Sequence, residues 1–596
     1  MASASATATQ FYESKFCMTA ILGLTAFHAG ASACLVIDGV PVFAIAEERI
    51  NRIKYYGGFP VLSIQACLDF AGLKLSEIGH VAVGRDPKAN RIEKAKFALG
   101  NVGKLTNILA MKRKMNAFGG IKQILAEAFD EDPANLGFQF HNVEHHIAHT
   151  ASSYFISPWE RCAGFSVDGS GDFVSTMLSD CEGDRIRILD KTYLPSSLGS
   201  LYTMICEFIG YARYGDEGKV MGLAPYGQDT YRDVFEDMIR LTPTGFELNK
   251  KYFVPFGSNP GLELNDRGEM IVHRHYSDEM IRIFGAPREP GAEYLQRDMD
   301  LAFCLQQRFE DVYMHMAKLA HAKVPSERVA LSGGCALNSV ANGKIFDQTP
   351  FTETAIQPAA GDDGLSMGAA LYVSNAVLRE GKRWAINDAY FGDAFTDEEI
   401  EQVLQDKGVA YVKLERGPLI EAAADAVAEG KVMGWFQGRM EWGPRALGNR
   451  SILVHPGYPG MKDILNARIK RREWFRPFAP AVLEERQNDI FEHSHPSPFM
   501  LHVYKIRPEW RARIDAVNHE DDTGRLQTVK RGENPLYHDL IAAFETRTGI
   551  PVLLNTSFNE NEPIVHTPEE AVDCYLRTKM DVLGIGSFWC AKDKAA

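Results

Sequence analysis

Residues 163–178 read AGFSVDGSGDFVSTML and decide the fold of the first part of the chain. The apolar run AGFSV predicts a buried strand that ends at Asp168, Gly169 to Gly171 predict a turn, and FVSTML predicts the returning strand. Residues 21–46, ILGLTAFHAGASACLVIDGVPVFAIA, have a similar plan, with a small-residue loop after the first strand and an Asp-Gly turn between the next two. Two hairpins of similar build predict two α/β half-domains.

Duplicated halves of this kind suit an actin-like architecture with a nucleotide cleft. Amphipathic helices are predicted over Leu62 to Leu73 and Leu301 to Lys323. Beyond the second helix, a polar stretch leads into a predicted helix from Asp397 to Gln405, which places a domain boundary close to residue 385. We therefore expect a disordered tail at 1–16, a first domain at 17–385 and a second domain at 386–596.

The composition is that of ordinary globular protein, with 45% hydrophobic and 24% charged residues in 596. A net charge of −14 argues against nucleic acid and anionic membranes as partners. The apolar stretch from Met18 to Phe27 is too short to span a bilayer and reads as a buried strand. The ten cysteines include no C-x-x-C pair, which fits a reduced, cytoplasmic setting.

A metal site is predicted from two histidines and two aspartates. His145 and His149 lie four residues apart in EHHIAHTASSY, at the start of a predicted helix, so both imidazoles project from one face. Asp168 and Asp362 stand in glycine-flanked segments, DGSGD and GDDG. Two nitrogen and two carboxylate ligands suit Fe(II), with Mn(II) or Zn(II) as alternatives. Taken as a lone pair, the histidines are better explained as partly buried residues with satisfied hydrogen bonds, and the two aspartates shift the balance toward a metal site.

Two glycine-containing segments are candidates for nucleotide contact, although neither matches a Walker-type phosphate loop. LSGGCALN offers Gly333 and Gly334, whose backbone amides would allow close approach of a phosphate, and Asn338. GDEGKVMGLAPYG offers Glu217 and Lys219. An ordinary turn is the alternative reading of each.

The second half of the chain is rich in arginine within an otherwise acidic protein. Guanidinium groups set among glycine and aromatic residues are suited to gripping phosphates, although each could also be solvated surface charge. The segment LLNTSFNENEP adds short polar side chains on a loop that follows an apolar strand. The candidates for binding in this half are Arg445, Lys470, Arg476, Arg525, Asn555 and Ser557.

The order of EERINRIKYYGGFP, EHHIAH, DGSGD, EGKVMGLAPYG, SGGCALN, GDDG, GPRALGNRSIL, FRPFAP and NTSFN resembles the O-carbamoyltransferases that modify nodulation factors, cephalosporins, aminoglycosides, ansamycins and saxitoxin-type toxins. The resemblance implies a Kae1-like, actin-related first domain and a YrdC-like α/β second domain. It also implies that the second domain makes carbamoyl adenylate from carbamoyl phosphate and ATP with Mg, and that the first transfers the carbamoyl group to a small-molecule hydroxyl.

Matched residue by residue, the resemblance implies iron ligands at His145, His149, Asp168 and Asp362. It implies contacts to carbamoyl phosphate and ATP from the arginine-rich half, with Lys470 and Arg525 in catalytic roles. His28 is our candidate for an acceptor-site residue or general base. One departure is the loop HAGASAC, which lacks the aspartate that relatives commonly carry shortly after this histidine. A different acceptor orientation, or a less cationic acceptor, would follow.

Two alternatives remain open from the sequence. A tRNA threonylcarbamoyl-type transferase would combine the same two domains, but the acidic charge and the lack of a basic groove argue against tRNA. A non-catalytic actin-like nucleotide-binding module would need neither the arginine-rich half nor two histidines beside two carboxylates. A homodimer is expected only because the resemblance to this family implies one.

Overall fold

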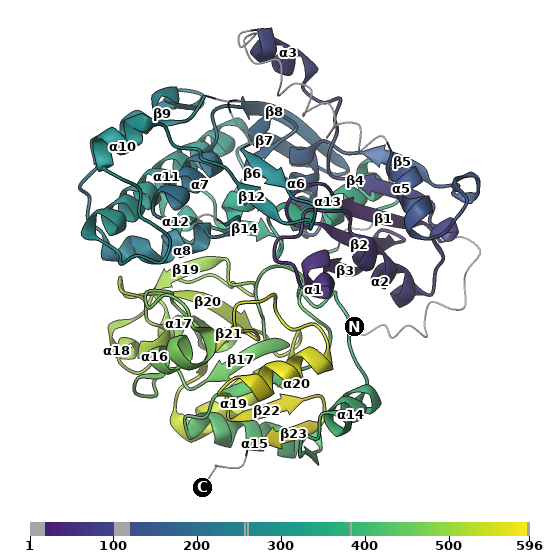
Figure 1. The fold of residues 1–596 in the computed structure, drawn as a ribbon, viewed down its shortest axis with the longest axis vertical. Helices are drawn as coiled ribbons and strands as arrows, with labels where there is room; N and C mark the ends of the chain where they lie inside the picture. Colours follow the sequence, from purple (N-terminus) through teal and green to yellow (C-terminus); the bar gives the residue numbers. More distant parts are fainter. Residues whose placement is uncertain are drawn as a thin grey trace. The chain divides into compact units, whose positions relative to one another are not determined.

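A computed structural model describes residues 18–99, 120–211, 213–255, 258, 261–381 and 384–592. The tail predicted at 1–16 lies outside these residues. Contacts divide the chain into two units, which we describe separately (Figure 1). Unit 1 comprises the described residues of Met1–Val220, Gly227–Leu337 and Ile345–Ala385, and unit 2 comprises Met221–Tyr226, Asn338–Lys344 and Ile386–Ala596.

Unit 1 is built on two five-stranded sheets with the same strand order. The first sheet is ordered β3-β2-β1-β4-β5 and the second β8-β7-β6-β13-β14. In each, three strands form an antiparallel meander and two more continue parallel to the first. The duplicated hairpins that the sequence predicts are therefore present. The strands are β1 Ala20–Thr25, β2 Ser32–Ile37, β3 Val40–Ala46, β4 His80–Val83, β5 Gln139–Asn142, β6 Arg161–Gly171, β7 Val174–Glu182, β8 Arg185–Tyr193, β13 Arg328–Ser332 and β14 Glu353–Ile356.

The predicted turn after Asp168 is wrong in its position. Strand β6 continues through Asp168 to Gly171, with a register shift between Val167 and Gly171. The chain reverses instead at Asp172 and Phe173, both of which have positive φ, at 49° and 78°. The glycines thus serve an irregular strand end, and the reversal uses two residues that rarely adopt this conformation.

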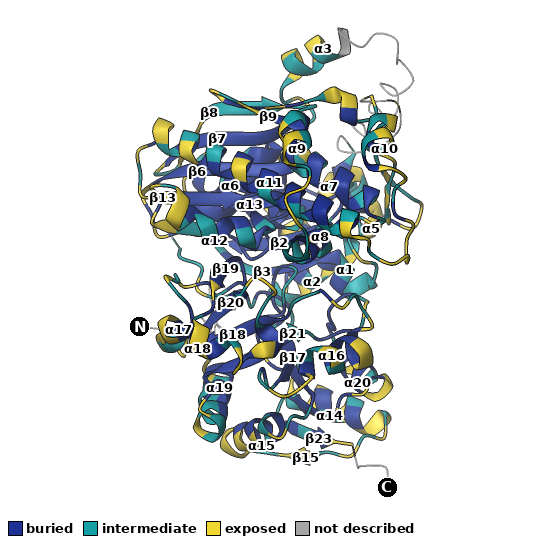
Figure 2. Ribbon diagram, turned by 90° about the vertical axis from the view of Figure 1, so that its left-hand side faces the viewer, coloured by how far each residue is buried: buried dark blue, intermediate teal, exposed yellow. Residues whose placement is uncertain are grey.

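Two equivalent helices pack between the halves of unit 1. Helix α6, His145–Tyr154, follows β5 and packs against β6 and β13 of the other half. Helix α13, Leu365–Tyr372, follows β14 and packs against β1, β2 and β4. Both helices are almost entirely buried, and so are most strands of the sheets (Figure 2). Each half thereby supplies part of the other's hydrophobic core.

Further helices and two short hairpins complete unit 1. The predicted helix at Leu62 to Leu73 is observed one or two residues earlier, and the one at Leu301 to Lys323 begins five residues earlier. The elements are α1 Glu47–Asn51, α2 Val61–Ala71, α3 Arg91–Leu99, α5 Ile121–Ala128, α7 Leu198–Phe208, α9 Arg232–Met238, β9 Ile239–Thr242, β10 Gly245–Leu248, β11 Leu262–Leu264, β12 Met270–Val272, α10 Asp278–Phe284 and α11 Gln296–Lys323. Two more helices, α8 Glu217–Leu223 and α12 Ser339–Gln348, have residues in both units.

Unit 2 is organised around one mixed nine-stranded sheet, ordered β15-β23-β22-β16-β17-β21-β18-β20-β19. The strands are β15 Val412–Lys413, β16 Met433–Phe436, β17 Arg450–Val454, β18 Ala479–Leu483, β19 His502–Lys505, β20 Thr523–Val529, β21 Val552–Ser557, β22 Val582–Ile585 and β23 Phe588–Ala591. The helices are α14 Asp397–Asp406, α15 Arg416–Ala428, α16 Met461–Leu465, α17 Gln487–Ile490, α18 Pro508–Arg511, α19 Pro535–Thr548 and α20 Pro568–Arg577.

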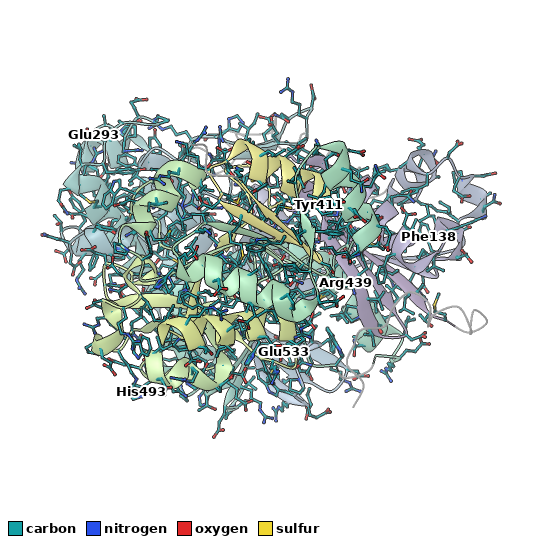
Figure 3. The ribbon with its side chains drawn as sticks, turned by 90° about the horizontal axis from the view of Figure 1, so that it is seen from below. Phe138, Glu293, Tyr411, Arg439, His493 and Glu533 are labelled. Atoms are coloured by element: carbon teal, nitrogen blue, oxygen red, sulfur yellow. The ribbon has the colours of Figure 1, made fainter. Side chains whose placement is uncertain are left out.

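The segments that begin unit 2 are fixed by hydrogen bonds to residues remote in sequence. Arg439, labelled in Figure 3, donates to the carbonyl oxygens of Phe391 and Gly392 at 2.5 and 2.9 Å. Asn342, from the earlier segment that clusters with this unit, donates to the Leu501 carbonyl at 2.9 Å. In the described part of the chain, no helix is both long enough and apolar enough to cross a bilayer.

Candidate functional site

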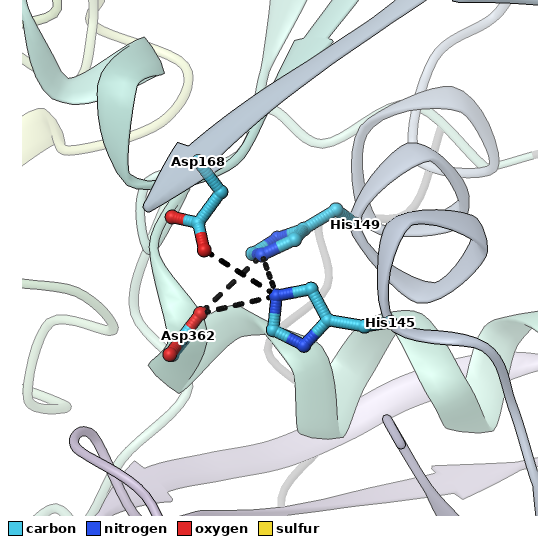
Figure 4. Close-up of side chains that lie close together, drawn as sticks. All are labelled: His145, His149, Asp168 and Asp362. Carbon is cyan, nitrogen blue, oxygen red and sulfur yellow. Dashed lines mark hydrogen bonds and ion pairs between the residues drawn. The ribbon is translucent and has the colours of Figure 1, made fainter. Parts of the chain in front are cut away.

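Four side chains of unit 1 converge on one point (Figure 4). His145, His149, Asp168 and Asp362 each direct one potential ligand atom to a cluster in which these atoms lie within 4.8 Å of one another. The two Nε2 atoms are 3.1 Å apart. Asp168 Oδ2 lies 3.4 Å from His145 Nε2, and Asp362 Oδ1 lies 3.4 Å from His149 Nε2. The structure therefore brings together all four residues of the predicted metal site.

The histidines are positioned by the capped N-terminus of α6. The Glu144 side chain caps the helix by accepting from Ile147 N at 2.9 Å. Asp172 Oδ2 accepts from His145 N at 3.0 Å and from Asp86 N at 2.8 Å, which ties the loop after β4 to the start of the helix. The spacing of four residues then places both imidazoles on one face of α6.

One contact holds the Asp168 carboxylate within its own half, and another holds the Asp362 backbone from the first half. Asp168 Oδ1 accepts from Gly334 N at 2.8 Å. The Asp362 carbonyl accepts from the Thr25 hydroxyl at 3.0 Å, at the end of β1. Because the ligand-bearing segments come from both halves, the cluster depends on the packing of unit 1 as a whole.

Close packing orients the His145 ring. A Cβ added at Gly171 would lie 1.9 Å from the His145 ring, so only glycine leaves room for the imidazole. The Nδ1 atoms of His145 and His149 are buried and have no hydrogen-bond partner within the described ranges. Ring orientation therefore rests on packing more than on hydrogen bonds to Nδ1.

Both carboxylates are held in the ionised state by the histidines. Burial by itself raises the pKa of Asp362, but hydrogen bonds from His149 and His28 hold it well below its usual range. Burial and the charge of Asp362 raise the pKa of Asp168, yet the His145 hydrogen bond lowers it overall. Conversely, the pKa of His145 is raised, because the two aspartates outweigh burial. Two buried nitrogens and two ionised carboxylates fit a divalent cation of borderline character.

His28 lies beside this cluster. Its Nδ1 is 3.1 Å from Asp362 Oδ2 and 3.2 Å from the Ala29 carbonyl oxygen, and burial lowers the pKa of the ring. The ring centroid is 6.1 Å from that of His145. The loop that lacks the aspartate thus follows β1 directly beside the predicted ligands.

The predicted nucleotide-contact glycines support the aspartate. Gly333 has φ of 89°, and a Cβ there would lie 2.1 Å from the Val167 carbonyl oxygen. The Gly334 amide donates to Asp168, a predicted metal ligand, so in this structure that amide hydrogen is not directed at a phosphate. These glycines allow β13 to approach β6 closely where Asp168 emerges.

The other candidates in unit 1 and the nearby segment of unit 2 make local contacts. Glu217 accepts from the Thr203 hydroxyl at 2.9 Å, and burial raises its pKa. Lys219 pairs with Asp216 at 2.8 Å. Asn338 belongs to unit 2, where its Oδ1 accepts from Ala341 N at 3.1 Å. These contacts of Glu217 and Lys219 are made with Thr203 and Asp216, which are not members of the histidine and aspartate cluster.

Unit 2 contains a separate cluster of guanidinium groups. Burial and the positive charges of Arg445, Arg472 and Arg476 together lower the pKa of Arg525 far below its usual range. Arg525 Nε is buried and has no hydrogen-bond partner in the described part of the chain. Arg476 is 3.7 Å from Glu473, and Arg472 lies over the Phe478 ring at 4.4 Å. So many cations around an unsatisfied donor form a site suited to an anion.

Lys470 is fully engaged within the fold. It is buried, and its Nζ donates to the Ser557 carbonyl at 2.5 Å and to the carbonyl and Oδ1 of Asn559 at 2.8 and 2.7 Å. An ammonium group has three hydrogens, and three good acceptors use them. In this structure Lys470 therefore fixes the loop after β21, including Ser557, whose hydroxyl donates to Asn559 Oδ1 at 3.0 Å.

Residues that the sequence analysis did not single out complete the second cluster's framework. Glu441 Oε1 accepts from the backbone amides of Leu447, Asn449 and Arg450 at 2.8, 2.8 and 3.0 Å, and thereby shapes the loop that carries Arg445. Asn555 donates to the Ala446 carbonyl at 3.2 Å. A glutamate that precedes Trp-Gly-Pro-Arg was a visible signal, but its backbone role depends on the loop's conformation.

Comparisons with known proteins agree over nearly the whole chain. Residues 20–371 match a family model described as the carbamoyltransferase N-terminus, and residues 424–592 match the carbamoyltransferase C-terminus. The uncharacterized protein sll1178 of Synechocystis sp. is 37% identical over 96% of this chain and 97% of its own length. Nodulation protein NolNO of Sinorhizobium fredii is also 37% identical, over 96% of this chain and 80% of its own length.

Solved structures are more distant. HypF of T. kodakarensis covers 61% of this chain and 49% of its own, at 14% identity and a TM-score of 0.30. That score is too low to support an argument.

Proposed function

The chain belongs to the carbamoyltransferase family, and on that premise we propose that it is an ATP-dependent O-carbamoyltransferase acting on a hydroxyl group of a small molecule. A carbamoyl-transferring enzyme needs a site that activates the carbamoyl donor and a site that delivers the group to its acceptor. We assign activation to the guanidinium cluster of unit 2 and transfer to the histidine and aspartate cluster of unit 1.

The observation that carries the proposal is the environment of Arg525. Its buried Nε has no partner among the described residues, and its near neighbours of like charge are Arg445, Arg472 and Arg476. Cations held this closely repel one another unless an anion lies among them. Carbamoyl phosphate and the ATP phosphates, with Mg, would supply that anion. Asn555 and Ser557 lie on β21, which β18 separates from β20, the strand of Arg525, and Lys470 positions the loop after β21.

The activation chemistry balances in two steps. Carbamoyl phosphate and water give carbamate and inorganic phosphate, and a carbamate oxygen then attacks the α-phosphorus of ATP and displaces pyrophosphate. The product is carbamoyl adenylate, a mixed anhydride. Arginine side chains stabilise the negative charge that moves onto the departing pyrophosphate.

The transfer site would hold Fe(II), or Mn(II) or Zn(II), through His145, His149, Asp168 and Asp362. When bound, the ion would supply Lewis-acid polarisation of the substrate. His28, which touches Asp362 but is not one of the four, would contact the acceptor or take its hydroxyl proton. We propose a small-molecule acceptor, with no nucleic acid or membrane partner, because the net charge of −14 argues against both.

The proposal is tested by release of pyrophosphate from ATP with and without carbamoyl phosphate. Release that requires carbamoyl phosphate is expected in the wild-type protein. Arg525→Ala is expected to reduce it by about a hundredfold or more, because one donor to a charged group contributes on the order of 3 kcal/mol in such sites. Arg525→Lys, which retains the charge without the planar fork, is expected to be intermediate.

Arg531→Ala is a matched control in the same unit. Arg531 is 72% exposed at its side chain and pairs with Asp539, so its removal is expected to leave pyrophosphate release unchanged. If the wild-type protein releases no pyrophosphate with carbamoyl phosphate, the activation reaction is excluded. If Arg525→Ala releases pyrophosphate at the wild-type rate, Arg525 has no role in activation.

A further inference from the structure

Asn466 presents a buried amide group beside the guanidinium cluster of unit 2, and the proposed function gives it no role. It begins a π-helical turn, Asn466–Lys470, that directly follows α16. The residue is only 6% exposed, and its Nδ2 is buried and has no hydrogen-bond partner in the described ranges. A buried donor without a partner is costly, so a ligand that accepts from this group would offset that cost.

The contact with Arg472 identifies which atom of the Asn466 amide is unpartnered. Arg472 Nε donates to Asn466 Oδ1 at 2.9 Å. A guanidinium group can only donate, so the atom that it contacts must be the amide oxygen. The other atom is therefore the NH₂ nitrogen, a donor. Since the oxygen and nitrogen of one amide are about 2.2 Å apart, Nδ2 lies within roughly 5 Å of Arg472 Nε.

The Arg472 side chain is held in one orientation. Its Nη2 donates to the Pro477 carbonyl at 3.3 Å, and its guanidinium group lies over the Phe478 ring at 4.4 Å. Together with the Asn466 contact, these interactions fix the plane of the group. Its Nη1 makes no hydrogen bond with the part of the chain that the structure describes. Two donors, Arg472 Nη1 and Asn466 Nδ2, are thus fixed close to each other.

The pairing of β18 places these contacts at the same end of the sheet as Arg525 and Asn555. The segment that Arg472 contacts leads directly into β18, whose first residue, Ala479, pairs with Asn555 of β21. On its other side β18 runs parallel to β20, with Ala481 opposite Gln527. Ala479 and Arg525, each two residues earlier, therefore lie at the same level. Gln527 Oε1 accepts from Asn555 Nδ2 at 2.8 Å, and the alternation of side chains puts Arg525 on the same face.

The charges around Arg472 support an anion at this position. Burial lowers the pKa of Arg472 well below its usual value, and the charges of Arg476 and Arg445 lower it further against the opposing charge of Glu473. Arg472 has the same effect on the pKa of Arg525. An anion held among these groups relieves their mutual repulsion. A neutral amide donor beside them adds a hydrogen bond to that anion without adding charge.

We propose that Asn466 is a substrate-binding residue whose amide nitrogen donates to a phosphoryl oxygen, beside Nη1 of Arg472; this inference rests on the proposed function. The ligand class is a phosphoryl group, since its several charged oxygens accept from donors that arrive from different directions. Carbamoyl phosphate and ATP both carry such a group. Asn466 binds and orients this group and takes part in no bond making or breaking.

The test measures binding of inorganic phosphate to the full-length protein by isothermal titration calorimetry. Asn466→Asp keeps an acceptor for Arg472 but replaces the donor with a carboxylate. Asn466→Ser removes the amide without adding charge. Both variants are expected to weaken phosphate binding by about tenfold to a hundredfold, the range for loss of a hydrogen bond to a charged group.

Asn488→Asp is the matched control, because it makes the same change at an exposed amide of unit 2 and keeps the acceptor for the Ser494 hydroxyl. Its phosphate affinity is expected to equal that of the wild type. If only Asn466→Ser is impaired, Asn466 acts through Arg472 and the inference is wrong. If only Asn466→Asp is impaired, charge repulsion explains the loss and the inference is again wrong. Should Asn466→Ser not fold, unchanged phosphate affinity of Asn466→Asp would still contradict the inference.

Pyrophosphate release by the same variants identifies the substrate that carries the phosphoryl group. A raised KM for carbamoyl phosphate at constant KM for ATP assigns the contact to carbamoyl phosphate, and the reverse result assigns it to ATP. Unchanged KM values for both substrates contradict the inference, and so does a wild-type protein that does not bind phosphate. If the wild type binds phosphate and both Asn466 variants bind it weakly, but no pyrophosphate is released, the proposed function fails and the phosphate contact stands.

Discussion

At the scale of single residues, the geometry of the four-residue cluster depends on a missing side chain. A Cβ at position 171 would overlap the His145 ring, at 1.9 Å. If unit 1 holds the proposed iron, we predict that Gly171→Ala displaces the imidazole and lowers iron content to less than about a tenth of wild type, since a misplaced ligand costs a large part of metal affinity. Metal analysis of the purified protein by mass spectrometry measures this directly.

Gly169→Ala provides the comparison within the same strand. A Cβ added there has no heavy atom within 4 Å, so this variant is expected to retain iron. Equal metal content in the two variants would show that packing against His145 does not control the site. Circular dichroism of both variants establishes whether unit 1 has kept its fold.

The residue types at the two clusters could be predicted from the sequence, whereas the partners of each residue could not. Histidine spacing on a helix and aspartates in glycine-flanked segments are local patterns, and the structure brings those four residues together. The contacts of Lys470 with Ser557 and Asn559 span nearly ninety positions. No local pattern reports such a contact.

At the scale of elements, hydrophobic periodicity predicted the positions of strands and helices. Glycine residues did not always predict the positions of turns. The helices at 61–71 and 296–323 have strong periodicity, and their predicted limits differ by a few residues. The reversal after β6 occurs at Asp172 and Phe173, and Gly171 before them is required for close packing against His145. Tertiary packing here outweighs the local turn preference.

The start of α19 carries a titratable group that links stability to pH. Burial raises the pKa of Glu533 to about 7, and the charges of Glu484 and Asp388 add to this effect against the opposing charge of Lys530. An unfolded glutamate has a pKa near 4.3, so between about pH 4.5 and 7 the folded state binds more protons than the unfolded state. Protonation of Glu533 therefore stabilises the folded state relative to the unfolded state at low pH. This contribution to the free energy of unfolding is lost as the pH rises through 7.

We predict that Glu533→Gln removes this loss. The melting temperature of the variant minus that of the wild type should increase between pH 5 and pH 8, as measured by differential scanning fluorimetry in buffers of equal ionic strength. A difference that is constant across this range would contradict the raised pKa. The neighbouring Lys530→Gln variant, which removes the opposing charge, should increase the pH dependence.

At the scale of the whole molecule, the two clusters belong to different units, each with its own sheets. A ligand that binds only one unit stabilises the native state of that unit. We predict that chelation of iron increases hydrogen exchange in α6 and β6, and leaves β18 and β20 protected to the wild-type extent. Hydrogen–deuterium exchange with peptide-level mass spectrometry measures both units in one sample. Equal deprotection of β18 and β20 would contradict the assignment of the metal to unit 1.

The duplicated α/β plan of unit 1 could be predicted because a similar hairpin pattern occurs twice in the sequence, at residues 21–46 and 163–178. The sequence does not predict that residues 221–226 and 338–344 belong to unit 2, because these segments lie within long stretches of unit 1. Asn342 shows the cause, since its partner Leu501 is remote in sequence. Sequence order alone does not reveal which unit a short segment completes.

The parallel strands β1, β4 and β5 end side by side, and the loops at 26–31 and 84–90 leave from that common edge. Neither loop forms part of a strand in the sheets, and neither carries any of the four converging ligands. In evolutionary terms, positions of these loops other than His28, our candidate base, can accumulate substitutions while the predicted metal-binding residues stay under selection. If the proposed function holds, the four converging residues determine the carbamoyl chemistry, and the loops determine the choice of acceptor. New acceptors then arise in this lineage by replacement of the loops.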